Sequence, residues 1–131
     1  MVDTEGLLIK VKVVAANHYD NQFGWEMIQL ARQKTQRLKK IWVDKGYEDG
    51  FTELLARYHY DCDVEVVTRP EDTKGWLLLP RRWVVERTFA WVGRFRRMSK
   101  DYEYLPETSE AMIYACMMTH MLRRLTTIKA V

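Results

Sequence analysis

Residues 81–100 read RRWVVERTFAWVGRFRRMSK, and this stretch decides how the rest of the chain is interpreted. Within it, one set of mostly apolar residues recurs at spacings of three and four, which is the period of one helix face. The members of this stripe are Val84, Thr88, Trp91, Phe95 and Met98. The pattern therefore predicts an amphipathic helix from Arg82 to Met98.

The same stretch concentrates the positive charge of the chain. It holds seven cations and one acid, Glu86, whereas the rest of the 131-residue chain holds 14 cations and 17 acids. The overall net charge of +3 thus hides a local basic patch. A patch of this kind favours a polyanionic partner at one surface.

Around this helix the chain alternates between strand-like and helix-like segments, which predicts a mixed α/β fold. Runs rich in β-branched residues predict strands at Leu7–Val14, Leu38–Val43 and Asp63–Thr68. Helical periodicity predicts helices at Phe23–Arg37, at Phe51–Tyr60 and from Glu107 to about Thr127. We expect a polar turn at Pro70–Gly75 and extended chain at Trp76–Leu79. The absence of repeats and linkers favours a single domain over residues 1–131.

The last of these helices is apolar nearly all round. Its core reads MIYACMMTHML, and Pro106 occupies the first turn, where proline is tolerated. A helix without a polar face is expected to be buried.

Several classes of protein are excluded by composition. No stretch approaches the roughly 18 consecutive apolar residues of a membrane span, and the N-terminal sequence MVDTEG has no signal-peptide character. We therefore expect a cytoplasmic protein with no membrane partner. Cys62 and Cys116 lack metal-site spacing, so we interpret them as free thiols.

Two acids are placed where they could act together. On the predicted Arg82–Met98 helix, Glu86 shares a face with Arg82, Gly93 and Arg97, away from the apolar stripe. Asp44 directly follows a predicted strand, and carboxylates at the carboxyl ends of strands are well placed in open α/β sheets. Mg²⁺ sites that act on phosphodiesters use few carboxylates and add substrate oxygens. On composition alone, however, a solvated charged face is the favoured alternative.

Four segments add a resemblance that covers almost the whole chain. They are VDTEGLLIKVKVVAANHYD (2–20), IWVDKGY (41–47), TRPEDTKGWLLLPRRWVVERTFAWVGRFRRMSKDYE (68–103) and LPETSEAMIYACMMTHMLRRL (105–125). Together they resemble the C-terminal part of a bacterial insertion-sequence transposase of the DDE type. The resemblance implies a partial RNase H-like fold, a mixed sheet with flanking helices.

Such enzymes use two aspartates and a glutamate to bind Mg²⁺ or Mn²⁺, cut DNA at transposon ends and join the 3′-hydroxyl to a target. The resemblance implies that Asp44 is the second acid and Glu86 the third. Arg82 matches the arginine of the family's tyrosine-arginine-glutamate-lysine signature. Leu79 and Gly93 stand where the tyrosine and the lysine would be, so the lysine's contacts would pass to Arg94 or Arg97.

The resemblance also implies that the basic patch contacts DNA phosphates at the transposon ends and at the target. The residues expected to do so are Arg82, Arg87, Arg94, Arg96, Arg97 and Lys100.

The first acid has no evident counterpart. In the family it lies on the first, central strand, upstream of a hairpin whose turn resembles VDTEG, and Asp-Thr-Glu-Gly is typical of a turn. We therefore expect Asp3 to be a turn residue and the central strand to be missing. A truncated transposase of this kind would bind metal weakly and have little or no activity.

Two consequences of the missing strand follow. Unpaired strand edges predict marginal stability, aggregation, or pairing with a second copy or a full-length transposase. The alternative function is a remnant without catalytic activity that binds DNA or another transposase.

Overall fold

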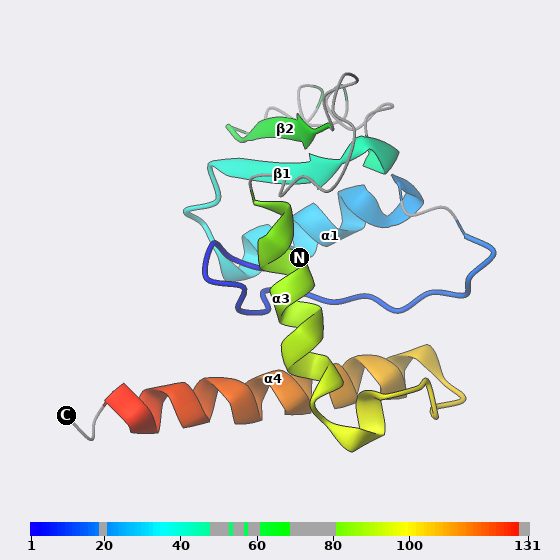
Figure 1. Ribbon diagram of the computed structural model, residues 1–131. Coiled ribbons are helices and arrows are strands. Elements are labelled where there is room, and N and C mark those ends of the chain that lie inside the picture. Colours follow the sequence, from blue (N-terminus) through cyan, green and yellow to red (C-terminus); the bar gives the residue numbers. More distant parts are fainter. Residues whose placement is uncertain (19–20, 48–52, 54–56, 58–60, 69–80, 129–131) are drawn as a thin grey trace, which may run out of the picture. The chain divides into compact units, whose positions relative to one another are not determined.

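The computed structural model describes residues 1–18, 21–47, 53, 57, 61–68 and 81–128. Two compact units can be distinguished, one formed by Ala16–Trp83 and one that combines Met1–Ala15 with Val84–Val131. We call them the sheet unit and the helical unit and describe each by itself. Figure 1 shows the elements that belong to them.

The sheet unit contains two parallel strands, β1 (Lys40–Asp44) and β2 (Asp63–Val67), which lie side by side in Figure 1. Their register runs from Lys40 opposite Asp63 to Asp44 opposite Val67. Both strands were predicted, and their existence is confirmed with ends shifted by one or two residues. An exposed ion pair of 2.8 Å joins Lys40 Nζ to Glu65 Oε2, and this hydrogen bond lowers the pKa of the Glu65 carboxyl.

The helix α1 (Asn21–Lys34) precedes β1 in the same unit. It buries Ile28 and Ala31 completely, one turn apart on the same face. Arg32 and Lys34 lie in its last turn, where cations complement the helix dipole. The predicted helix is therefore confirmed, although it ends three residues before Arg37.

After β1 the chain makes a short 3₁₀ helix, η1 (Lys45–Tyr47). The expected helix Phe51–Tyr60 lies outside the described residues apart from Glu53 and Arg57, which are helical. The expected turn and extended segment of residues 70–79 also lie outside them.

The helix α3 (Arg82–Gly93), which belongs to the helical unit from Val84 onward, begins as predicted but is shorter than predicted. After Gly93, the N–H groups of Arg94 and Phe95 donate hydrogen bonds to the carbonyls of Trp91 and Val92, each three residues earlier in the chain. Phe95 is then extended and leads into η2 (Arg96–Met98). Glycine is a weak helix former, which explains the end at Gly93. The prediction that Arg97 shares a helix face with Glu86 is therefore wrong, because Arg97 is not on α3.

The 23-residue helix α4 (Pro106–Ile128) is confirmed, with Pro106 as its first residue. The expectation that it is buried is correct for one face, where Ser109, Cys116 and Met117 are buried. It is wrong for another face, where Met118, Leu122 and Leu125 are each more than half exposed. No helix within the described part of the chain is long and apolar enough to cross a membrane.

The N-terminal segment does not form the predicted strand Leu7–Val14. Among the described residues its backbone makes one isolated antiparallel bridge, from Val2 to Leu8. Beyond this bridge, the N–H of Val11 donates to Tyr114 Oη at 3.3 Å and the N–H of Val13 to Glu110 Oε1 at 3.0 Å. Alternate N–H groups thus bind side chains of α4 instead of a neighbouring strand, which explains the difference.

The turn before this segment packs closely on α3. Gly6 is buried and has a φ angle of +78°, in the left-handed region that glycine adopts without strain. The Thr88 hydroxyl lies 2.7 Å from the Gly6 carbonyl oxygen and 3.0 Å from that of Val84. Arg87 adds a second connection, since its Nη2 donates to the Glu5 carbonyl at 2.8 Å.

An aromatic and cationic cluster links α3 to α4. The rings of Trp91 and His120 stack with centroids 4.2 Å apart, and the guanidinium of Arg87 lies 5.0 Å from the Trp91 ring centroid. His120 Nε2 is buried and has no hydrogen-bond partner within the described part of the structure. Burial, followed by repulsion from Arg124, Arg94 and Arg123, lowers the pKa of His120. The partly buried His120 ring therefore favours its neutral form more than a free imidazole does.

At the level of fold class, these elements confirm a mixed α/β protein. The described residues contain a two-stranded parallel sheet and three α-helices of the lengths given above.

We expect Gly6→Ala to destabilise the protein by about 1–3 kcal/mol. A Cβ at this position would lie 3.0 Å from Thr88 Oγ1 and 3.2 Å from the Trp91 ring, and the positive φ adds strain. Urea unfolding measures the change. Gly93→Ala is the matched control, because a Cβ there meets nothing within 4 Å. Equal destabilisation by both substitutions would contradict this account of the turn.

We expect stability to fall on acidification through His120. Because folding lowers the pKa of His120, its contribution is complete above the unfolded value of about 6.5 and is lost as the pH falls below that value. His120→Phe keeps a ring against Trp91 but cannot be protonated. The urea midpoint of the variant should therefore decrease less than that of the parent between about pH 7.5 and pH 5.5. An unchanged decrease would exclude His120 as the source.

Candidate metal and DNA site

Asp44 is the last residue of β1 and lies at the carboxyl end of the parallel sheet. Its side chain is exposed, and Oδ1 accepts a hydrogen bond of 3.1 Å from the N–H of Gly46. This bond holds the carboxylate beside η1. The sequence prediction that Asp44 ends a strand is confirmed.

Glu86 is an exposed residue of α3, one turn after Arg82. It belongs to the helical unit, whereas Asp44 belongs to the sheet unit. Each acid is therefore positioned on a regular element of its own unit. Their convergence on one ion stays a prediction.

Asp3 has the turn role that its sequence context predicts. Its Oδ1 accepts hydrogen bonds from the N–H groups of Glu5 at 2.9 Å and Leu7 at 2.8 Å. Its own N–H donates to the Leu7 carbonyl at 2.9 Å, which closes the turn. A carboxylate that accepts two backbone N–H groups is a structural element of the turn.

No group of three or more His, Cys, Asp or Glu side chains that could hold a metal ion is present in residues 1–18, 21–47, 53, 57, 61–68 and 81–128. Asp44 and Glu86, the two acids predicted to bind an ion, offer carboxylate oxygens, which are hard donors. This donor set suits Mg²⁺ or Mn²⁺, which combine one or two carboxylates with water and phosphate oxygens.

The cations of the basic patch differ in their surroundings. Arg87 is half-buried, and its guanidinium contacts the Glu5 carbonyl and the Trp91 ring. This guanidinium therefore takes part in packing within the helical unit. Arg81 similarly lies with its guanidinium carbon 4.9 Å from the centroid of the Trp42 ring. Exposed side chains are found at Arg82, Arg94, Arg96, Arg97 and Lys100.

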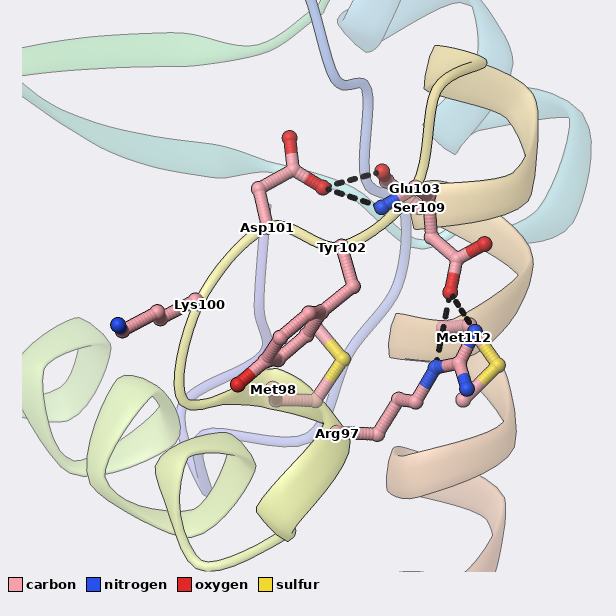
Figure 2. Close-up of a pocket in the computed structure, with 8 residues that line it drawn as sticks. All are labelled: Arg97, Met98, Lys100, Asp101, Tyr102, Glu103, Ser109 and Met112. Atoms are coloured by element: carbon pink, nitrogen blue, oxygen red, sulfur yellow. Dashed lines mark hydrogen bonds and ion pairs between the residues drawn. The ribbon is translucent and has the colours of Figure 1, made fainter.

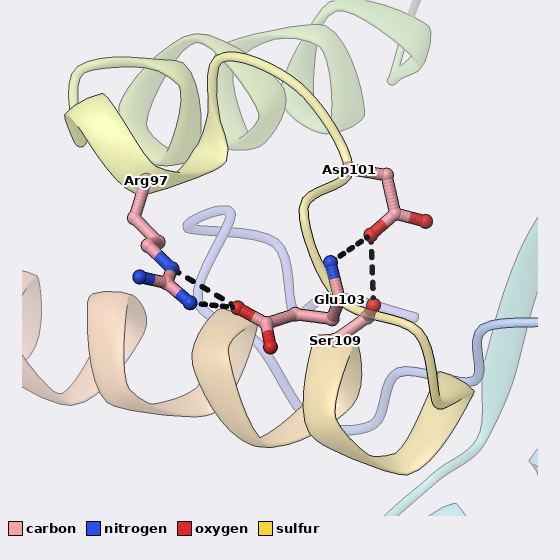
Figure 3. A network of polar contacts seen from close by, with 4 residues as sticks. All are labelled: Arg97, Asp101, Glu103 and Ser109. Carbon is pink, nitrogen blue, oxygen red and sulfur yellow. Dashed lines mark hydrogen bonds and ion pairs between the residues drawn. The ribbon is translucent and has the colours of Figure 1, made fainter.

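Arg97 is exposed but takes part in an ion pair that sequence spacing did not indicate. Its Nε and Nη2 lie 3.0 and 2.8 Å from Glu103 Oε1, as Figure 3 shows. Nearby, Asp101 Oδ1 accepts hydrogen bonds from the Glu103 N–H at 3.3 Å and from Ser109 Oγ at 3.0 Å. These contacts tie η2 to the loop at Glu103 and tie that loop to Ser109 in the first turn of α4. A separation of six residues across a loop gives no helical signal, so the pair was missed.

Arg97 and Lys100 also line a shallow surface pocket, together with Met98, Tyr102 and Met112 (Figure 2). The Lys100 side chain is drawn there without a contact to the other residues of the pocket. Two exposed cations therefore border the same pocket, and one of them, Arg97, is ion-paired with Glu103.

Comparisons with known proteins identify the family. A family model described as the transposase DDE domain matches residues 1–122. The chain is 36% identical over 69 residues to the Burkholderia cepacia protein named "Putative transposase for insertion sequence element IS402", a match that covers 52% of this chain and 31% of that protein. The chain thus spans about a third of the length of this curated relative. No solved structure matches the chain. Because the family model covers nearly all of its residues, the chain belongs to the DDE family of insertion-sequence transposases.

Proposed function

We propose that this chain carries the second and third metal-binding acids of a DDE transposase, Asp44 and Glu86, and acts on DNA at insertion-sequence ends and at a target. The observation that carries the proposal is the match of the transposase DDE domain to residues 1–122, which includes both acids. In support, both side chains are exposed and each lies on a regular element, β1 or α3.

The proposed fold is a partial RNase H-like domain. Its support in this chain is the parallel pair β1 and β2, with an acid at the carboxyl end of β1. A single domain over residues 1–131 is part of the same proposal.

In the proposed site, Asp44 and Glu86 hold Mg²⁺ or Mn²⁺. When bound, the ion supplies Lewis-acid activation of the phosphodiester and of the attacking oxygen. The contribution of the chain is to position the two carboxylates, one of them through the Gly46 N–H. The exposed arginines then hold the DNA backbone in reach of the acids.

We assign no metal-binding role to Asp3, because its carboxylate accepts hydrogen bonds within the turn. Asp44 and Glu86 by themselves are expected to hold a divalent ion weakly, so we propose weak cleavage or none by these two acids alone. If no cleavage accompanies DNA binding, the chain acts as a DNA- or transposase-binding protein, which is the second candidate function. The exposed cations support both candidates equally.

Removal of either acid should weaken Mn²⁺ binding. We expect Asp44→Asn and Glu86→Gln each to reduce the affinity by about tenfold or more, since each deletes one charged ligand. Calorimetric titration with Mn²⁺ measures the affinity. Glu107→Gln is the control, because it removes an exposed acid from the start of α4. If the three substitutions have the same effect, the assignment of Asp44 and Glu86 is wrong.

DNA binding should depend steeply on salt through the exposed cations. Each neutralised phosphate changes the slope of log K against log salt by about 0.9, so Arg94→Gln and Arg96→Gln should each reduce the slope by up to that amount. Fluorescence anisotropy with a short duplex over a salt series measures the slope. The matched control is Arg37→Gln, which removes an exposed arginine outside residues 81–100.

Glu86→Gln separates the two candidate functions in the same assay. It should retain DNA binding, since the removed charge repels phosphate, while it loses any Mn²⁺-dependent cleavage. DNA affinity that does not change with salt, or slopes that Arg37→Gln reduces as strongly, would contradict the proposed surface.

A further inference from the structure

The loop between η2 and α4 is anchored at Asp101. Oδ1 of this residue accepts hydrogen bonds from the Ser109 hydroxyl at 3.0 Å and from the N–H of Glu103 at 3.3 Å (Figure 3). Ser109 is buried and lies in the first turn of α4. The backbone at Glu103 is therefore connected, through Asp101, to a long helix.

The side chain of Glu103 in turn holds that of Arg97. Only 16% of the Glu103 side chain is exposed, whereas 62% of the Arg97 side chain is. Oε1 of Glu103 accepts two hydrogen bonds, from Arg97 Nε at 3.0 Å and from Nη2 at 2.8 Å. Two charge-assisted bonds to adjacent nitrogens fix the plane of a guanidinium group. An exposed arginine otherwise samples many rotamers, so Glu103 restricts the directions in which Arg97 can donate.

The guanidinium of Arg97 keeps a second edge for another acceptor. In Figure 3 both dashed contacts run to one edge of the group, and the remaining nitrogen, Nη1, points away from Glu103. Nη1 and the other N–H of Nη2 form a fork that matches two oxygens of a phosphate group. Lys100, a second cation, lines the same surface pocket as Arg97 (Figure 2). The surroundings of the open edge therefore suit a phosphate.

Neither stability nor long-range attraction accounts well for the pair of Arg97 and Glu103. Ion pairs with an exposed member contribute little to folding, and Asp101 already ties the loop to α4. The carboxylate also cancels the charge of Arg97, which reduces its attraction for a distant polyanion. What the pair supplies is a fixed direction for the remaining N–H donors.

We propose that Glu103 is a positioning residue that presents the open edge of Arg97 to one phosphate of the DNA backbone. This inference rests on the proposed function, because it requires that Arg97 contact DNA. A side chain that is already oriented loses less rotamer freedom on binding, so the phosphate contact of Arg97 is stronger with Glu103 in place.

Two neutral variants of Glu103 test the proposal. Glu103→Gln keeps an oxygen that can accept from Arg97, whereas Glu103→Met keeps the length of the side chain without that oxygen. Both remove the same negative charge, so their difference measures positioning alone. We expect Glu103→Met to bind a short duplex about threefold or more weakly than Glu103→Gln, measured by fluorescence anisotropy. Circular dichroism and urea midpoints confirm that both variants are folded. If Glu103→Met does not fold, Glu103→Ala replaces it, with the same direction expected.

The same two variants in an Arg97→Ala background are the matched control. Arg97→Ala alone should weaken DNA binding by about tenfold, because it deletes a charged donor. Without Arg97 the two variants should bind equally, since they no longer have a side chain to position.

Each result that contradicts the proposal can be distinguished. Equal DNA affinities of Glu103→Gln and Glu103→Met in the parent background would overturn the positioning role and leave the proposed function intact. A difference that persists in the Arg97→Ala background would assign the effect to Glu103 itself and overturn the proposal in the same way, as would parental affinity of Arg97→Ala. A parent chain that does not bind DNA would overturn the proposed function, and this inference with it.

Discussion

The helical unit depends on one close approach, that of the Gly6 carbonyl to the Thr88 hydroxyl at 2.7 Å. The contact requires a residue without a side chain at a φ of +78°. Backbone geometry and packing therefore both require glycine at position 6. Thr88 is buried, and its hydroxyl would be costly to leave unpaired there. The turn that contains Asp3 is therefore held against α3, the helix that also carries Glu86. The Gly6–Thr88 contact thus holds the turn in which Asp3 has a structural role, and it fixes this turn against the helix that carries Glu86.

The positive charge of residues 81–100 divides between packing and surface. Arg81 and Arg87 place their guanidinium groups near tryptophan rings, and Arg97 forms an ion pair with Glu103. Cation–π contacts and ion pairs of this kind use the charge locally. The number of cations in residues 81–100 therefore overstates the number of side chains whose charge is available to bind phosphates. In the proposed DNA-binding surface, the exposed residues Arg94, Arg96 and Lys100 would therefore contribute a larger share of the positive charge than the count of cations implies.

Sequence reasoning succeeded where local pattern is sufficient. The β-branched runs of β1 and β2 and the helical periods of α1 and α4 were read correctly, because these signals lie within one element. It failed for residues 7–14, since a strand also needs a partner, and Tyr114 and Glu110 of a distant helix take its N–H groups. It also overextended α3, because the periodic stripe continues to Phe95 and Met98 after the backbone has left the helix at Gly93. For the site, the position of Asp44 at a strand end was predictable from local sequence. The pair Arg97–Glu103 was not, since a loop brings its members together.

The composition of α4 shows how a correct pattern can support an incomplete conclusion. An all-round apolar helix was expected to be buried, yet the unit that contains it buries Cys116 and Met117 and leaves Met118 and Leu122 exposed. Transfer of apolar surface from water is favourable on every face of a helix. The helical unit nevertheless buries only part of the apolar surface of α4. The exposed residues Met118, Leu122 and Leu125 recur at spacings of four and three, so they lie on one face of the helix, opposite in burial to the face of Cys116 and Met117.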